Sequence, residues 1–208
     1  MVPYPQCRLS AASEALLRSA SEGDVGGMLD ALADGADLEA TDGLGCGAMH
    51  LAAGHGTTSA VRLLLEKGAA VDRPNADGLR PLQLAALYGQ TANAEALLNA
   101  GAPADDPEWE FPTASLAASC GHAACLLLLL ERGCSPASVA VDAWASVLTA
   151  ARVDQAIALV PYLSARNRSG VRDAIVERNP HAEAVVALDA HIAQLNVTRR
   201  LRVGGLRH

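Results

Sequence analysis

The chain has 208 residues, of which 50% are apolar and only 3% aromatic, so we expect a core of Ala, Leu and Val rather than of large rings. The formal charge of -7 argues against a general nucleic-acid binder, because affinity for phosphates depends on clustered Lys and Arg. No run approaches the roughly 18 consecutive apolar residues that a membrane-spanning helix requires, so no membrane insertion is expected.

Glycines recur in pairs that lie twelve positions apart, and successive pairs step by 33, 33 and 32 residues. An alanine stands three residues before the first glycine of each pair, and a leucine-rich stretch precedes the second glycine in all but the first unit. A step near 33 residues is typical of a repeated unit made of a turn and two helices. The pairs are Gly23 and Gly35, Gly56 and Gly68, Gly89 and Gly101, and Gly121 and Gly133.

A short N-terminal arm, residues 1–8, precedes the first unit, which we place at residues 9–40. This unit carries polar residues such as Glu14 and Arg18 among its apolar ones. Because the end units of a repeat array must keep one face polar, we expect the first unit to act as an N-terminal cap.

The second and third units, residues 41–73 and 74–105, follow the period most closely. Their second helices are expected to end at Gly68 and Gly101, where a left-handed residue is needed and glycine has no Cβ to obstruct it. Paired alanines keep the first helix of each unit thin, which favours close stacking of neighbouring units.

The fourth unit, residues 106–137, is one residue short, and the fifth, residues 138–166, is degenerate. In the fifth unit Asp154 and Arg166 replace the two glycines, and Pro161 is expected to interrupt the second helix. The altered turn of the fourth unit predicts a modified hairpin and contains Pro107, Glu108, Trp109, Glu110 and Phe111.

The period is lost in residues 167–196, where we predict a C-terminal helical cap with one helix near 170–178. A second helix is expected from Asn179, a good N-cap residue, with Pro180 at the favoured first helical position. A partner-binding or dimerising helix stays open as the alternative. Residues 197–208 form a basic tail, either flexible or able to add as a strand to another protein. The apolar residues at helical spacing are Val185, Leu188, Ile192 and Leu195.

Three segments resemble the ankyrin-repeat family. Gly-Cys-Gly-Ala-Met-His-Leu-Ala-Ala (45–53) and Gly-Leu-Arg-Pro-Leu-Gln-Leu-Ala-Ala (78–86) are similar to its opening motif, and Val-Arg-Leu-Leu-Leu-Glu-Lys-Gly-Ala-Ala-Val-Asp (61–72) is similar to its second helix and exit. The resemblance covers residues 15–137. It implies an all-α solenoid of stacked helix-turn-helix units with short β-turn fingers, to which the C-terminal helical cap is added.

No residue pattern supports catalysis. His50 stands at the histidine of the opening motif, and the resemblance implies that its imidazole hydrogen-bonds nearby backbone. Gln83 and Ser115 occupy the matching positions, which excludes a catalytic role shared by the repeats. The chain contains neither a phosphate-binding loop nor a nucleophile elbow. We therefore expect no enzymatic activity and no cofactor.

A cluster of metal-ligand residue types in the fourth unit does not have the paired Cys-x-x-Cys spacing of structural zinc sites, so packing cysteines are expected there and no metal. The five cysteines of the chain form an odd set, which predicts reduced thiols. The N-terminus lacks the pattern of a secretory signal, so we expect a cytoplasmic location, with an organelle or the nucleus within a larger complex as the alternative. The cluster consists of Cys120, His122, Cys125 and Cys134.

The resemblance implies that a protein partner contacts the projecting turns and the exposed positions of the first helices, which line one concave face. Acidic residues along the turns favour a partner with a basic or amphipathic segment. Aromatic residues are rare in this chain, and aromatic anchors dominate many interfaces. The alternative that Trp109 and Phe111 fold back over their own turn stays open. The predicted partner-binding residues are Leu44, His55, Asp77, Leu79, Leu87, Tyr88, Glu108, Trp109, Phe111 and Ser119, with Ser21, Glu22 and Cys46 as further variable positions.

These patterns predict a protein-binding scaffold, an adaptor or a stably bound subunit of a larger assembly. The alternative is a regulatory recruiter, such as a substrate receptor for a ubiquitin ligase. Residues 167–208 do not convincingly contain the ligase-docking helix that some ankyrin receptors carry, which disfavours this alternative. The oligomeric state is left open.

Overall fold

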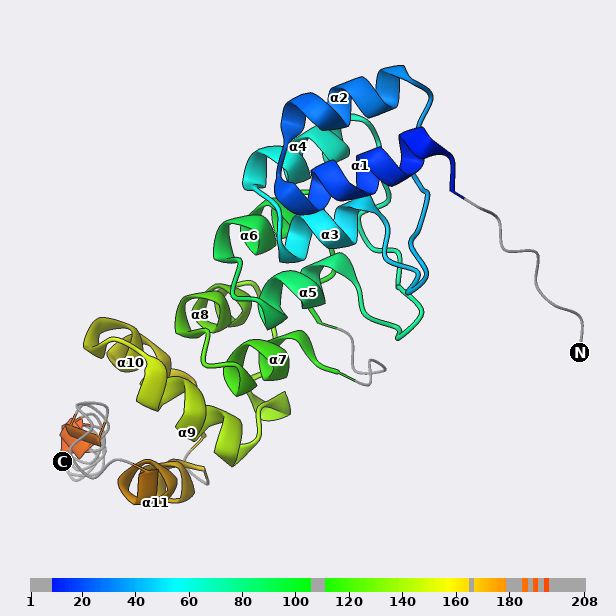
Figure 1. The fold of residues 1–208 in the computed structure, drawn as a ribbon. Helices are drawn as coiled ribbons and strands as arrows, with labels where there is room; N and C mark the ends of the chain where they lie inside the picture. Colours follow the sequence, from blue (N-terminus) through cyan, green and yellow to red (C-terminus); the bar gives the residue numbers. More distant parts are fainter. Residues whose placement is uncertain are drawn as a thin grey trace, which may run out of the picture. The chain divides into compact units, whose positions relative to one another are not determined.

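The computed structural model of the chain describes residues 9–105, 111–164 and 167–178, together with the pairs 185–186, 189–190 and 193–194. The chain divides into two compact units, unit 1 (Met1–Ala104) and unit 2 (Asp105–His208), each of which is described by itself. The described part of both units is built from helices and connecting turns (Figure 1).

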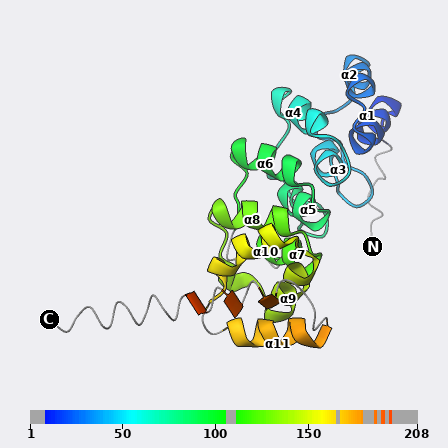
Figure 2. The same ribbon diagram turned by 90° about the vertical axis from the view of Figure 1, so that its left-hand side faces the viewer.

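Unit 1 contains three pairs of antiparallel helices. The first helices of the pairs, α1, α3 and α5, pack side by side, and the second helices α2, α4 and α6 form a second row against them (Figure 2). The helices are α1 (Ala11–Glu22), α2 (Val25–Ala33), α3 (Ala48–Gly54), α4 (Thr58–Glu66), α5 (Pro81–Leu87) and α6 (Thr91–Asn99).

Side-chain caps determine where several of these helices begin. The Ser10 hydroxyl accepts a hydrogen bond from the Ser13 amide at 3.1 Å at the start of α1. The Thr57 hydroxyl accepts one from the Ala60 amide at 3.3 Å at the start of α4. Proline, whose missing N–H costs nothing in the first turn, is the first residue of α5.

The second helices end at glycines, as the sequence predicts. Gly68 and Gly101 follow α4 and α6 with φ values of +83° and +92°, in the left-handed region that a side chain disfavours. A Cβ at either position would meet no atom within 4 Å, so the backbone conformation alone accounts for glycine there.

Small residues allow the rows of unit 1 to approach closely. Ala52, Ala53, Ala85 and Ala86 on the first helices are completely buried. A Cβ at Gly56 would meet the carbonyl oxygen of Ala20 in the preceding pair and lie 2.8 Å from the Ala52 Cα. The thin first helices that the paired alanines predict are therefore part of the packing between repeats.

A buried asparagine joins successive helix pairs. The Asn93 amide on α6 donates to the carbonyl oxygens of Ala52 and Ala53 at 3.1 and 3.2 Å and reaches that of Gly56 at 3.3 Å. Its side-chain oxygen accepts a hydrogen bond from the Thr58 hydroxyl at 2.7 Å. The side chain therefore adds hydrogen bonds to carbonyl groups in the last turn of α3 and just after it, where intrahelical bonding ends.

Unit 2 continues the pairwise pattern. Within it α7 packs on α8 and α9, α8 packs on α10, and α9 packs on α11. Trp144 of α9 is buried at the centre of the unit. The helices are α7 (Thr113–Ser119), α8 (Ala123–Glu131), α9 (Val141–Ala150), α10 (Val153–Leu159) and α11 (Arg168–Arg178), with 3-10 turns η1 (Pro136–Ser138) and η2 (Val160–Tyr162).

Pro161 has the effect that the sequence predicts, because α10 ends at Leu159 and the chain continues as the 3-10 turn η2. Helix α11 includes the predicted stretch 170–178. The division of the chain into repeats, arm, cap and tail stays a prediction, and the N-terminal arm, Asn179, Pro180 and the tail 197–208 lie outside the described residues.

Candidate partner-binding surface

In unit 1 a tight turn, which we call a finger, precedes each of two first helices: finger 1 (residues 41–47) precedes α3, and finger 2 (74–80) precedes α5. In finger 1 the Asp42 carboxylate accepts hydrogen bonds from the amides of Leu44 and Cys46, both at 2.8 Å. Thr41 and Gly47 form an isolated antiparallel bridge at its base. The local hydrogen bonds fix the finger conformation.

Finger 2 repeats this arrangement with an amide in place of the carboxylate. The Asn75 side-chain oxygen accepts hydrogen bonds from the amides of Asp77 at 3.0 Å and Leu79 at 2.8 Å. The two fingers also bond to each other. The Ala76 amide donates to the Leu44 carbonyl oxygen at 3.0 Å, and Asn75 Nδ2 lies 3.3 Å from the Cys46 sulfur. Neighbouring fingers therefore form one connected edge.

Two polar side chains link the fingers to the helices. His50 Nδ1 accepts a hydrogen bond from the Gly47 amide at 3.1 Å, and Nε2 lies 3.2 Å from the Leu79 carbonyl oxygen. At the matching position of the next repeat, Gln83 accepts a hydrogen bond from the Arg80 amide at 2.8 Å. Burial lowers the pKa of His50 below its ordinary value, and the bond to Leu79 acts in the opposite direction. The predicted structural role of His50 is confirmed.

At the far ends of α3 and α5, two predicted residues contact each other. The rings of His55 and Tyr88 have centroids 4.3 Å apart and are tilted by 51°. Glycine at position 54 makes room for this contact, because a Cβ there would lie 3.1 Å from a ring carbon of Tyr88. Tyr88 as a whole residue is 46% exposed. The sequence predicts both residues at the surface, but it does not predict their contact.

The remaining predicted residues differ in accessibility. Leu44 is 65% exposed and Asp77 is also exposed, whereas Leu79 and Leu87 are half-buried. Cys46, one of the further variable positions, is buried, and burial raises the pKa of its thiol. We call the part in unit 1 the inner surface. It consists of Leu44, Asp77 and Leu79 on the fingers, and His55, Leu87 and Tyr88 at the helix ends.

Four predicted residues belong to unit 2 and are not part of the inner surface. Phe111 and Ser119 are exposed. Glu108 and Trp109 lie outside the described residues. The alternative that Trp109 and Phe111 fold back over their own turn therefore stays open.

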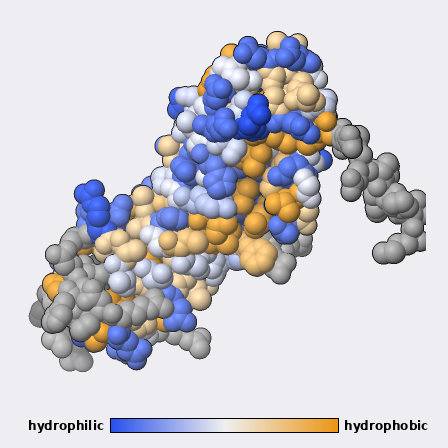
Figure 3. Space-filling view, in the orientation of Figure 1, coloured by the Kyte–Doolittle hydropathy of each residue, from blue (hydrophilic) through white to orange (hydrophobic). Residues whose placement is uncertain are grey.

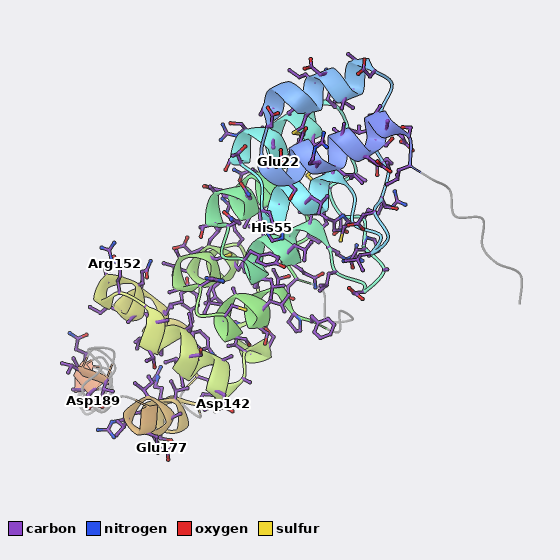
Figure 4. All side chains as sticks on the ribbon, in the orientation of Figure 1. Glu22, His55, Asp142, Arg152, Glu177 and Asp189 are labelled. Carbon is purple, nitrogen blue, oxygen red and sulfur yellow. The ribbon has the colours of Figure 1, made fainter. Side chains whose placement is uncertain are left out.

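Unit 1 as a whole carries negative charge. Residues 9–104 hold 12 acids and 5 bases. Two of the bases make ion pairs within the unit, Arg73 with Glu39 at 3.4 Å and Arg80 with Asp72 at 2.8 Å. Glu22 and His55 lie at the corresponding ends of successive first helices (Figure 4).

Two of the three fourth-unit cysteines are buried packing residues, whereas Cys120 is exposed. Cys125 and Cys134 are buried, and burial raises the pKa of each thiol to about 12. In the part of the chain that the structure describes, no group of three His, Cys, Asp or Glu side chains is placed to hold a metal ion. Within the same part, no helix combines the length and the hydrophobicity needed to cross a membrane.

Comparison with protein families identifies the repeat. A family model described as ankyrin repeats, in three copies, matches residues 16–108, which include five whole helices and most of α1. A search of curated proteins found no match to the chain. The all-α repeat fold expected from the sequence is thereby confirmed.

Proposed function

Residues 16–108 belong to the ankyrin-repeat family, whose members are generally protein-protein interaction modules, and from this we propose that the chain is a non-enzymatic scaffold that binds a protein partner through the inner surface of unit 1. In its cellular role it is an adaptor or a stably bound subunit of a larger assembly.

The preformed inner surface carries this proposal. Of the large apolar side chains that are exposed in the described part of unit 1, Leu44 and Tyr88 lie on the inner surface and Leu29 lies on α2. Hydrophobic surface extends over the first helices between hydrophilic stretches (Figure 3). Because the finger backbone is held by hydrogen bonds, a partner orders little additional structure when it binds, which favours affinity.

The charge of unit 1 indicates the kind of partner. An apolar surface with acidic residues around it fits a segment that presents apolar side chains flanked by basic ones. Asp77 contributes from the fingers and Glu22 from the end of α1, whereas the Asp42 carboxylate is used within its own finger. The predicted basic or amphipathic partner segment is therefore part of this proposal.

Affinity capture with the full chain as bait tests the proposal. Leu44→Asp and Tyr88→Ser should each reduce partner recovery and weaken the affinity of the purified partner by about tenfold or more, as expected for central interface positions. Leu29→Ser is the control, because it removes from α2 an apolar side chain that is exposed to nearly the same extent as Tyr88.

The pattern of losses decides the outcome. Equal loss with the Leu29 control, or unchanged capture in both surface variants, contradicts binding through the inner surface. A partner recovered in fixed stoichiometry supports a stable subunit. Many partners in low amounts, with a ligase among them, contradict that role.

A further inference from the structure

The Tyr88 ring is fixed in position before any partner binds. The ring packs against Gly54, where a Cβ would lie 3.1 Å from a ring carbon. The ring of His55, from the neighbouring repeat, contacts it as well. Even so, Tyr88 is an exposed residue, with 46% of its surface in solvent. An aromatic side chain with few rotatable bonds and two fixed contacts loses little entropy when a ligand covers its free surface.

The surroundings of the ring contain no competing cation from the first helices. Residues 48–55 and 81–88, which form α3, α5 and their last exposed positions, include neither Lys nor Arg. Arg80, directly before α5, makes an ion pair with Asp72 at 2.8 Å. His55 and Tyr88 stand directly before the first glycine of the pair in their repeats. Glu22 stands at the matching position of the first repeat. The charged residues of unit 1 are mostly acidic, with 12 acids and 5 bases in residues 9–104.

We propose that the partner places an arginine side chain on the exposed part of Tyr88, an inference that rests on the inner surface being the binding site. The face of an aromatic ring attracts a cation, and a planar guanidinium can stack on it while remaining hydrated at its edges. An acidic side chain would be repelled by the net charge of unit 1. Glu22, one repeat beyond His55, attracts the same segment at longer range.

Selection from a random peptide library with the full chain as bait supplies the probes for the test. The selected peptides should be enriched in arginine. Their affinities are then measured by fluorescence polarisation for the wild type, Tyr88→Phe and Tyr88→Leu, with Leu29→Ala as the control. Tyr88→Phe keeps the aromatic face and should bind within about twofold of the wild type. Tyr88→Leu keeps an apolar side chain without that face and should bind about three- to tenfold more weakly.

Substitution of the peptide's arginine by norleucine should produce a similar loss in the wild type and little further loss in Tyr88→Leu. Peptides without arginine, equal affinities for Tyr88→Leu and the wild type, or no selected binder at all would overturn the inference. Leu44→Asp separates this failure from that of the proposed function. If Leu44→Asp weakens binding and Tyr88→Leu does not, only the arginine inference fails. If neither substitution weakens binding, the inner surface is not the binding site.

Discussion

At the scale of single residues, His50 and Gln83 have the same structural role at the start of successive first helices. Each accepts a hydrogen bond from the amide three residues earlier, at the start of a first helix. His50 also reaches the next finger through its Nε2 atom, at the carbonyl oxygen of Leu79. The sequence predicts the first bond because the motif places His50 there, but the second depends on the position of the next repeat.

The lowered pKa of His50 makes stability depend on pH. Because the folded state holds the imidazole neutral, its contribution is fully present above the unfolded pKa of about 6.5 and is lost as the pH falls below that value. The melting temperature of the wild type should therefore fall between about pH 7 and pH 5, and His50→Gln should reduce this dependence. A pH dependence of the melting temperature that is the same in His50→Gln as in the wild type would contradict the assignment.

At the scale of helices and turns, glycines have two different structural functions. Gly101 ends α6 in a left-handed conformation with open space around it, and Gly56 lies against backbone atoms of Ala20 and Ala52. The sequence predicts the first function because a glycine after a leucine-rich helix marks a cap. It does not predict the second, because the close approach is set by how the preceding helix pair packs.

This difference should appear in the free energy of unfolding. Gly101→Ala only forces an alanine into the left-handed backbone conformation, which should lower the free energy of unfolding by about 1 kcal/mol. Gly56→Ala places a Cβ against backbone that cannot rotate away and should cost about 3 kcal/mol. Urea unfolding of the two variants measures both values. A larger loss for Gly101→Ala would show that the packing of the first helices around Gly56 is looser than described.

At the scale of the whole molecule, the period predicts the repeat fold, and the resemblance to ankyrin repeats implies the surface on which a partner is expected. The residues of that surface are harder to predict, since their exposure depends on neighbours 33 positions away. The sequence predicts Tyr88 and His55 as partner-binding residues because they stand at variable positions of the repeat. Only the structure shows that their rings are in contact. Cys46 occupies a variable position but is buried beneath the next finger, where Asn75 contacts its sulfur.

The central claim is that unit 1 binds its partner through the inner surface, and hydrogen–deuterium exchange of the full chain with and without the captured partner tests it most directly. Binding should slow amide exchange in the fingers and at the ends of α3 and α5, because these segments become covered. Exchange in α2, α4 and α6 should stay unchanged. Protection confined to these second helices, with the fingers exchanging as in the free chain, would contradict the account.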